Sequence, residues 1–392
     1  MNLEASPLVR IHHLLVRRGR PPHSQIALRL EELEIYRGET LAMIGPNGAG
    51  KSSLLLVLAR LLPWQEGEIW FAGLPLERQN ALAYRRKIGL VLQEPLLLNR
   101  SVFDNVAAGL RFRGLPTDEV KQRVETWLER LGIVHLGNRP AGQLSAGEAQ
   151  RASLGRALAL QPELLLLDEP FNALDAPTRL RLMEDLHALL QNHSLTTVFV
   201  THDQDEALQL GNRVAVFLEG SLRQVGSPQQ VFGAPADEQV AAFVGVETVL
   251  PGKVFSSHNG QVMLISNEVP IHAVGAAERG QEVLACLRPE DITLWQAGAL
   301  PASSARNRLR GCIQRLVQSG PLVRVVVLAG AMPLPDVRAS PGQALPGACE
   351  EEKMPLTLVA FVTRPSADEM RLAPGVEVTA TFKASAVHLI IR

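Results

Sequence analysis

The chain of 392 residues lacks several features that would place it in particular classes of protein. No apolar stretch reaches membrane-spanning length: the longest candidates, Leu54–Leu62 and Leu322–Ala329, are short, and each contains an arginine. The cysteines Cys286, Cys312 and Cys349 are scattered without metal-ligand spacing. This argues against a disulfide framework and fits a reducing cytosol.

The chain has almost no net charge and no visible targeting signal. The formal net charge is −1, which gives no general attraction to nucleic acid, and we expect no nucleic acid partner. Residues 1–6 show no basic start followed by an apolar run, so no secretory signal is expected. Aromatic residues make up 4% of the chain, and none precedes Tyr36. The chain as a whole is 46% hydrophobic and 20% charged, which is ordinary for a globular protein. Its length predicts two or three domains.

The first 235 residues alternate short apolar strands with helical patterns, which predicts an α/β domain with a parallel sheet. Strands are expected at Leu41–Ile44, Leu164–Leu167 and Thr197–Val200, because continuous aliphatic runs are typical of buried parallel strands. The pattern between them, at about residues 94–160, is helical. We therefore expect a helical insert within the α/β domain.

The character of the sequence changes after residue 235. Short β-rich runs separated by turn residues predict all-β, OB-like barrels. We expect a linker at residues 236–246, a first β-rich unit at 247–296 and a second at 303–392. Residues 331–354, rich in proline, glycine and charge, are expected to be a surface loop inserted between strands.

A glycine-rich loop follows the first predicted parallel strand and matches the spacing G-x-x-x-x-G-K-[ST]. Glycines let the backbone turn its N–H groups toward phosphate oxygens, and the following helix adds its positive end. Lys51 would neutralise the β- and γ-phosphates, and Ser52 would coordinate Mg²⁺. The residues expected to bind the nucleotide are Gly45, Pro46, Asn47, Gly48, Ala49, Gly50, Lys51, Ser52 and Ser53.

Two acidic residues end the aliphatic strand at 164–167. The carboxylate of Asp168 can reach the sheet edge near the loop and hold Mg²⁺, and Glu169 can orient and deprotonate an attacking water. Alone, two acids at this place would more often only cap a strand. Behind a matched phosphate loop they favour catalysis.

Residues 144–148 read Leu-Ser-Ala-Gly-Glu. Ser145 and Glu148 fit a capping box, so any helix could begin in this way. The same helix start offers the Ser145 hydroxyl and the Gly147 N–H to an anion. We expect Glu148 to fold back on its own helix end, because its carboxylate would repel a phosphate.

The phosphate loop, the 144–148 string and the acidic pair, in this order, resemble the ATP-binding subunits of ABC transporters. The resemblance implies a P-loop ATPase domain in which two subunits form a homodimer around two ATP molecules, with Mg²⁺. Glu169 and His202 would be catalytic together with Gln93, which would also reach the metal alongside Ser52 and Asp168. The partner subunit would supply its signature residues and its D-loop aspartate, namely Ser145, Ala146, Gly147, Glu148 and Asp175.

The resemblance also implies partners and a location. A separate membrane permease would be driven by ATP hydrolysis, a solute-binding protein would capture the solute outside, and this chain would lie at the cytoplasmic face of the membrane. The aromatic residue that the family stacks on adenine is missing. Arg18 is a candidate in its place, because a guanidinium plane can stack on a base, although a solvated basic hairpin explains it equally well.

The β-rich half resembles the TOBE domains that follow the ATPase domain in import subunits, on the string Leu287–Asp291. Residues 303–307 and 382–387 look like the type of this domain (TOBE/MOP-like) that binds molybdate or tungstate. Donors without a neutralising carboxylate suit an oxyanion, and here they are Ser304, Arg306, Asn307, Lys383 and Ser385. These residues could instead only shape the barrel.

The resemblance implies an ATP-hydrolysing subunit of an importer. The solute it favours is molybdate or tungstate. Import of sulfate, a sugar or a polyamine remains an alternative, as does an oxyanion-sensing regulatory ATPase that is not coupled to transport.

Overall fold

The computed structural model describes residues 6–19, 24–172, 174–193, 195–296, 303–330 and 355–392. The chain divides into two compact units, one ending at Phe232 and the other spanning Gly233–Arg392.

The N-terminal unit is built on a ten-stranded sheet in the order β5-β4-β1-β2-β10-β9-β3-β8-β7-β6. Its strands are β1 Pro7–Arg18, β2 Gln25–Tyr36, β3 Thr40–Ile44, β4 Glu66–Phe71, β5 Leu74–Pro75, β6 Ile88–Val91, β7 Leu164–Asp168, β8 Thr196–Val200, β9 Arg213–Leu218 and β10 Ser221–Gly226. Strands β6, β7, β8, β3 and β9 run parallel to their neighbours in this part of the sheet. Every residue of β3 and β8 is buried, as their aliphatic sequences predict.

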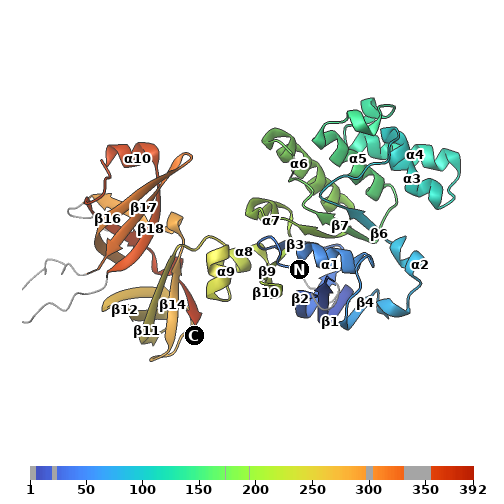
Figure 1. Ribbon diagram of the computed structural model, residues 1–392. Helices are drawn as coiled ribbons and strands as arrows, with labels where there is room; N and C mark the ends of the chain where they lie inside the picture. The colour runs from blue at the N-terminus through green and yellow to red at the C-terminus, as the bar shows by residue number, and fades with distance from the viewer. Residues whose placement is uncertain (1–5, 20–23, 173, 194, 297–302, 331–354) are drawn as a thin grey trace, which may run out of the picture. The chain divides into compact units, whose positions relative to one another are not determined.

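The helices of this unit are α1 Lys51–Leu58, α2 Ala81–Arg85, α3 Val102–Phe112, α4 Thr117–Arg130, α5 Ala146–Leu158, α6 Ala176–His193, α7 Gln204–Leu210 and α8 Pro228–Gly233, with short 3₁₀ turns at Leu76–Arg78, Val134–Leu136 and Ala141–Gln143. Figure 1 shows α3, α4 and α5 gathered away from β1 and β2. Helix α4 buries Val120, Val124, Trp127 and Leu128, one face at helical spacing. The α/β fold with a helical insert is therefore confirmed.

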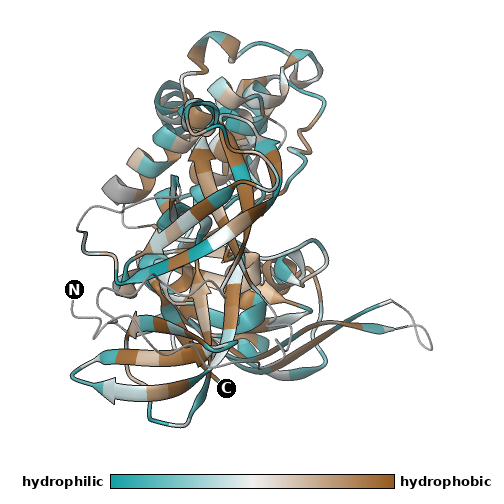
Figure 2. Cartoon of the chain, turned by 90° about the vertical axis from the view of Figure 1, so that its left-hand side faces the viewer, coloured by the Kyte–Doolittle hydropathy of each residue, from teal (hydrophilic) through white to brown (hydrophobic). Residues whose placement is uncertain are grey.

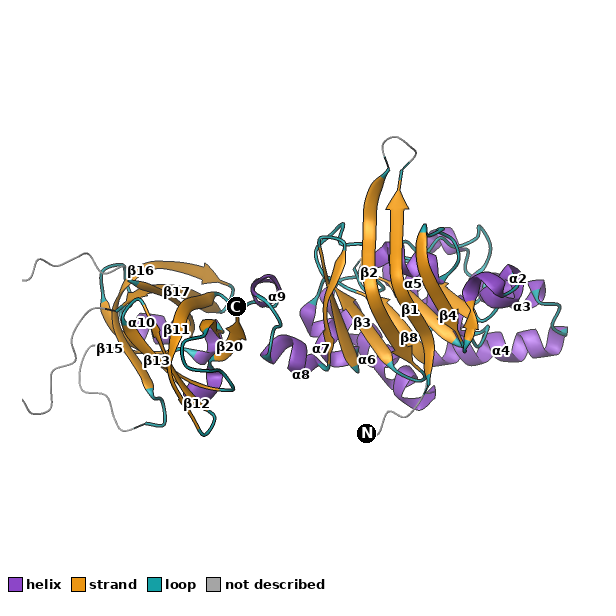
Figure 3. Cartoon of the chain, turned by 90° about the horizontal axis from the view of Figure 1, so that it is seen from below, coloured by secondary structure: helices purple, strands orange, loops and turns teal. Residues whose placement is uncertain are grey.

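Strands β1 and β2 form a long antiparallel ribbon, paired from Pro7↔Tyr36 to Arg18↔Gln25. They extend beyond the rest of the sheet (Figure 3). Their pairing places Arg18 opposite Gln25 at the end of the ribbon.

The C-terminal unit contains α9 Glu238–Phe243 and two five-stranded sheets, in the orders β13-β12-β11-β14-β20 and β15-β19-β16-β17-β18. The elements are β11 Thr248–His258, β12 Gln261–Ser266, β13 Val269–Val274, β14 Glu282–Leu287, β15 Thr293–Gln296, β16 Asn307–Ser319, β17 Leu322–Ala329, β18 Leu356–Thr363, α10 Arg364–Glu369, β19 Glu377–Phe382 and β20 His388–Ile391, with 3₁₀ turns at Pro289–Asp291 and Ala384–Ala386. Figure 2 shows apolar residues, in brown, interspersed with hydrophilic ones, in teal, along the strands. One apolar cluster joins residues of both sheets, among them Leu264 and Val327.

The expected division into units 247–296 and 303–392 differs from the observed sheets. Strand β15, from the first expected unit, pairs with β19 in the second sheet, and β20, from the end of the chain, pairs with β14 in the first. Strand runs are visible in a sequence, but pairing between distant runs is not, because it depends on packing across the whole core. The two expected units are therefore one folded body.

The expected linker at 236–246 is also different from what the structure shows. It contains α9, which Asp237 caps by accepting from the Val240 N–H, and Val240 and Ala241 are buried. His388 on β20 contacts the Pro235 carbonyl at 2.9 Å, so this segment belongs to the C-terminal unit. The loop expected at 331–354 lies outside the described residues.

Across the described part of the chain, no helix combines the length and apolar character needed to span a membrane.

Candidate functional site

The glycine-rich loop joins β3 to α1, and two of its glycines cannot carry a side chain. Gly45 has φ 151°, and a Cβ atom there would lie 2.0 Å from the Phe217 carbonyl oxygen. Gly50 has φ 91°, and a Cβ atom would lie 2.5 Å from the Ala27 carbonyl oxygen. The loop therefore packs directly on backbone at both ends, and α1 begins at the next residue, with its first N–H groups unpaired within the helix.

Lys51 is buried at the base of this loop, with 5% of its surface exposed. Its Nζ donates to the carbonyl oxygens of Gly45, at 2.6 Å, and Pro46, at 2.8 Å. Desolvation lowers the pKa of Lys51, and the carboxylates of Glu169 and Asp168 oppose this shift. A buried ammonium held only by neutral carbonyls would gain from phosphate oxygens, because an anion satisfies its charge as well as its donors.

Ser52 and Asp168 meet although they are far apart in the chain. The Ser52 hydroxyl donates to Oδ1 of Asp168 at 2.9 Å. Desolvation raises the pKa of Asp168, and the hydrogen bond from Ser52 opposes the shift. A hydroxyl beside a partly dehydrated carboxylate fits Mg²⁺, which prefers oxygen ligands and takes few of them from protein when phosphates supply the rest. No group of three His, Cys, Asp or Glu side chains that could hold a metal ion exists in the described residues.

Glu169 follows β7 in a left-handed backbone conformation, φ 45°, which is uncommon for a residue with a side chain. Its N–H donates to the Val200 carbonyl at 3.0 Å, which fixes this turn against β8. One carboxylate oxygen lies 3.6 Å from Nδ1 of His202, and the other accepts from Nδ2 of Asn172 at 2.8 Å. The predicted acid and histidine are thus brought together, and Asn172 is a contact that the sequence did not reveal.

The segment that carries His202 is held by an ionic network. Arg179 of α6 pairs with Asp203 and, through Nε at 2.9 Å, with Oε1 of buried Glu206. The Thr201 hydroxyl donates to the other Glu206 oxygen. Desolvation raises the pKa of Glu206, and Thr201 and Arg179 oppose this. The Asp-x-x-Glu spacing at 203–206 could have indicated the start of α7, whereas nothing local in the sequence points to Arg179.

Gln93 lies just beyond β6 and is exposed. Strand β6 pairs with β7 at Val91↔Leu167, so the register places Gln93 level with the end of β7, where the acidic pair lies. Its position at the sheet edge is therefore that expected from the sequence, with the side chain open to solvent.

A cleft of about 600 Å³, the glycine-loop cleft, lies over this site. It is lined by residues 47–53, by Glu169, and by the ends of β1 and β2, including Arg18, Gln25 and Ile26. Arg18 is close enough to contribute to lowering the pKa of Asp168, after larger effects of burial, Ser52, Glu169 and Lys51. The β1–β2 register accounts for Gln25 and Ile26, which the motifs alone could not indicate.

The 145–148 segment begins α5 as a complete capping box. The Glu148 N–H donates to the Ser145 hydroxyl at 3.3 Å, and the Ser145 N–H donates to the Glu148 carboxylate at 2.7 Å. This second hydrogen bond is the main cause that lowers the pKa of Glu148, and Arg139 lies 3.6 Å from the same carboxylate. The expectation that Glu148 folds back on its own helix end is confirmed, and Ser145 and Ala146 remain exposed.

The start of α5 packs on the start of α6. A Cβ atom on buried Gly147 would lie 2.6 Å from Cγ2 of Thr178. Asp175 is exposed and caps α6, accepting from the Thr178 N–H at 3.0 Å and hydroxyl at 2.9 Å. These hydrogen bonds lower the pKa of Asp175. Neither this segment nor Asp175 lines the glycine-loop cleft of the same chain.

The residues expected to bind an oxyanion differ in their surroundings. Asn307 is 2% exposed, and its amide is used by the backbone of His272, donating to the carbonyl at 2.8 Å and accepting from the N–H at 2.7 Å. Arg306 donates to Gln261 at 3.1 Å. The pairing Asn307↔Phe382 brings Arg306 and Lys383 to the same end of β16 and β19, whereas Ser304 and Ser385 are exposed nearby in sequence. The Asn307 amide therefore ties β13 to β16.

Comparisons with known proteins agree with this geometry. A family model described as ABC transporter matches residues 28–172, and one described as TOBE domain matches residues 348–389. The chain is 34% identical over 375 residues to the molybdate/tungstate import ATP-binding protein WtpC of Pyrococcus horikoshii, covering 94% of this chain and 96% of that protein. It is 32% identical over 360 residues to the spermidine/putrescine import ATP-binding protein PotA of Oleidesulfovibrio alaskensis, covering 91% of each.

Among solved structures, the ATP-binding cassette MJ0796, a dimer in a post-hydrolysis state with ADP and Pi, matches with a TM-score of 0.52 and 28% identity. The match covers 56% of this chain and 98% of that one. Its extent fits the N-terminal unit, which holds the loop, the acidic pair and His202. The chain therefore belongs to the ABC transporter family, as an ATP-hydrolysing subunit of the import type with a TOBE domain.

Proposed function

We propose that this ATPase energises import of a molybdate- or tungstate-type oxyanion through a separate membrane permease, with Mg²⁺ as its cofactor. The observation that carries the catalytic part is the convergence of Lys51, the Ser52–Asp168 pair and the Glu169–His202 pair at one sheet edge. The cargo rests on similarity over nearly the full length to an import subunit named for molybdate and tungstate.

In the proposed reaction each residue has one task. The Lys51 ammonium exchanges its loop carbonyls for the β- and γ-phosphate oxygens, and the Ser52 hydroxyl and Asp168 carboxylate would hold Mg²⁺. When bound, Mg²⁺ neutralises charge on the phosphate oxygens. Glu169 accepts a proton from the water that attacks the γ-phosphorus, while His202 donates a hydrogen bond to a γ-phosphate oxygen.

Two copies of the chain complete each site in this proposal. Ser145 and Ala146 are exposed at the start of α5, Asp175 is exposed at the start of α6, and none of them lines the cleft of its own chain. A helix start with free donors is suited to a phosphate brought by a second molecule. The dimeric form of the similar cassette supports this arrangement.

The remaining partners follow from the import role. A separate permease chain would provide the membrane path, with Gln93 at the exposed sheet edge linking nucleotide state to its cytoplasmic face. An extracytoplasmic protein would deliver the solute. The import names of the full-length relatives support this assignment. In this proposal the chain would lie at the cytoplasmic face of the membrane.

The catalytic proposal is tested by Glu169→Gln, which keeps the shape of the side chain but removes the base. Hydrolysis should fall by about 100-fold or more while ATP binding persists, because general-base catalysis typically contributes this much. An ATP-bound dimer should accumulate and be visible by size-exclusion chromatography. Lys51→Ala should instead lose ATP binding as well. Unchanged hydrolysis by Glu169→Gln would contradict the assignment of the base.

The cargo is tested in cells from which this chain has been deleted. Uptake of labelled molybdate or tungstate should be lost, restored by the wild-type chain and not restored by Lys51→Ala. Loss of sulfate, sugar or polyamine uptake in its place would assign a different cargo to the same ATPase.

A further inference from the structure

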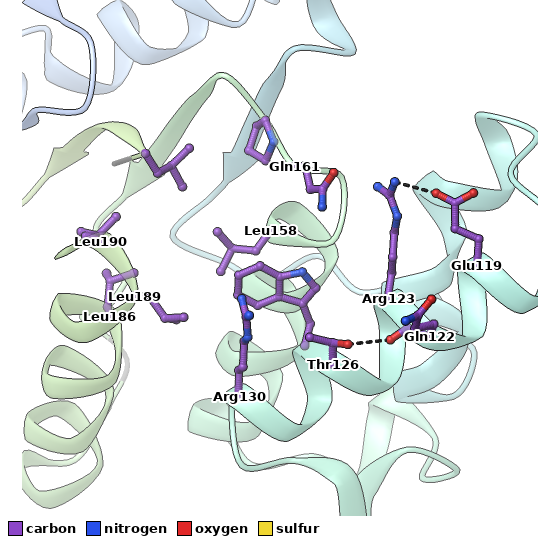
Figure 4. Close-up of a pocket in the computed structure, with 13 residues that line it drawn as sticks. Glu119, Gln122, Arg123, Thr126, Arg130, Leu158, Gln161, Leu186, Leu189 and Leu190 are labelled. Carbon is purple, nitrogen blue, oxygen red and sulfur yellow. Dashed lines mark hydrogen bonds and ion pairs between the residues drawn. The ribbon is translucent and has the colours of Figure 1, made fainter. Parts of the chain in front are cut away.

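A second hollow in the N-terminal unit, the α4–α6 pocket, has a volume of about 720 Å³, larger than that of the glycine-loop cleft. Figure 4 shows Arg123 and Arg130 of α4 on one side of this space and Leu186, Leu189 and Leu190 of α6 on the other. The volume lies in the range of small-molecule sites. Neither the motifs nor the proposed ATPase reaction uses this pocket.

The two walls of the pocket differ in chemistry. The wall formed by α6 and the end of α5 is apolar, with Leu158, Leu186, Leu189 and Leu190. The α4 wall carries Trp127, whose ring lies 5.0 Å from the Arg130 guanidinium. The apolar part of a ligand would fit between these leucines and the indole ring. Binding would be favourable because it removes apolar surface of both walls from water.

The charged side chains of the α4 wall favour a negatively charged ligand. Arg123 and Arg130 line the pocket together with a single carboxylate, Glu119, whose Oε1 accepts from Nη2 of Arg123 at 2.6 Å. A guanidinium has five N–H donors, and Glu119 engages one nitrogen of Arg123. An acidic group on the ligand would bind here through charge-assisted hydrogen bonds.

The pocket lies at the far ends of the two helices that begin at the proposed partner-facing residues. Helix α5 starts after Ser145 and ends at Leu158, while α6 starts after Asp175 and passes Leu186 to Leu190. The helices are tied together between these ends, because Arg151 of α5 donates to Asp185 of α6 at 2.7 Å. An occupant that contacts α4, α5 and α6 at once would restrict movement of α5 relative to α6.

We propose that the α4–α6 pocket binds an organic monoanion with an aromatic or branched apolar body, and that binding slows ATP hydrolysis. The acid group lies at Arg123, and the apolar body lies between Trp127 and Leu189. Binding fixes α4 and α5 against α6 and so restrains the start of α5. This coupling to hydrolysis, but not the binding itself, rests on the proposed role of the α5 start in a second subunit's site.

The test is titration calorimetry of the full chain without nucleotide, with 1-naphthylacetate as the probe. Its neutral analogue 1-naphthaleneethanol and its cationic analogue 1-naphthylmethylamine are compared. We expect one naphthylacetate per chain, and affinity lower by about tenfold or more for the neutral analogue and for Arg123→Gln, since a charge-assisted hydrogen bond is lost. Leu189→Glu, which places a carboxylate on a half-buried position of the apolar wall, should abolish binding.

The matched control is Lys121→Gln, which removes one positive charge from the same helix at a position that does not line the pocket. It should bind naphthylacetate as the wild type does. The site is overturned if no binding occurs at millimolar probe, if the cation binds as tightly as the anion, or if Arg123→Gln and Leu189→Glu bind normally.

The coupling is read from ATP hydrolysis at saturating naphthylacetate. Hydrolysis by the wild type should fall by about fivefold or more, the lower end of usual allosteric coupling, and hydrolysis by Leu189→Glu should not change. Binding without any effect on hydrolysis would overturn the coupling. Absence of ATPase activity in the untreated chain would instead count against the proposed function, because the calorimetry needs no nucleotide.

Discussion

Helices α1 and α5 both begin at glycine-containing segments suited to phosphate, yet their surroundings are opposite. The start of α1 is partly enclosed, because Lys51 is buried and Glu169 lines the cleft beside it. The start of α5 is exposed, and its own Glu148 carboxylate already accepts from the Ser145 N–H. In the proposed reaction, most of the residues around the first start come from its own chain. At the α5 start, the Glu148 carboxylate is already held by its own helix end, and Ser145 and Ala146 are exposed. This suits a phosphate that another molecule brings.

A large effect is expected at Gly147, where α5 meets α6. In Gly147→Ala the new methyl meets Cγ2 of Thr178, whose hydroxyl is engaged with Asp175, so both proposed partner-facing segments must shift. We expect hydrolysis to fall by about tenfold while ATP binding at the α1 start is unchanged, since small misplacements at a reaction site are costly.

The companion variant carries Thr178→Ser as well as Gly147→Ala. Serine removes the obstructing methyl and keeps the hydroxyl that donates to Asp175, so most of the hydrolysis rate should return. Steady-state ATPase assays give the hydrolysis rates of the single and the double variant, and nucleotide titrations give their affinities for ATP. A rate that stays low in the double variant would show that the clash is not the cause.

A smaller effect concerns stability and its dependence on pH at the His202 segment. Burial raises the pKa of Glu206 above its usual value of 4.5, and Arg179 opposes this rise. Between the ordinary and the raised pKa the folded chain binds more protons than the unfolded chain, so stability falls as pH increases through this window. In Arg179→Met the pKa should rise further and the window should extend upward.

We therefore expect Arg179→Met to lose more unfolding free energy at pH 8 than at pH 5, in urea titrations at both pH values. Arg181→Met, on the same helix and exposed, is the control and should show no such difference. An equal loss at both pH values would mean that the contact with Glu206 contributes little and that Arg179 acts through its ion pair with Asp203 and through packing.

The smallest effect is expected for Glu148→Gln. Because the Glu148 carboxylate faces its own helix end and Arg139, the amide should change the hydrolysis rate by no more than about twofold and lower helix stability only slightly. Thermal melting and ATPase assays measure the two effects. A tenfold increase in rate would indicate that the carboxylate faces the phosphate after all.

The sequence predicted the parts of this molecule that depend on local spacing. The phosphate loop, the Glu148 capping box and the convergence of Asp168 with Ser52 follow from residue order, because parallel strands bring their carboxyl ends to one edge. The exchange of β15 and β20 between sheets and the Arg179 network do not, because they depend on pairing between distant segments. A local sequence pattern does not indicate which distant segments will contact each other.

If the α1 and α5 starts of one chain serve two different ATP molecules, mixing two inactive variants should restore hydrolysis. Lys51→Ala disables the α1 start. Ala146→Asp adds a charge that suits a helix N-terminus but repels a phosphate facing it, with Ala146→Ser as the active control. Random pairing makes half of the dimers mixed, and each mixed dimer keeps one intact site of two.

We expect each variant alone to hydrolyse almost no ATP and the equimolar mixture to recover about a quarter of the wild-type rate. A mixture as inactive as the separate variants would show instead that both helix starts act on the same chain's ATP.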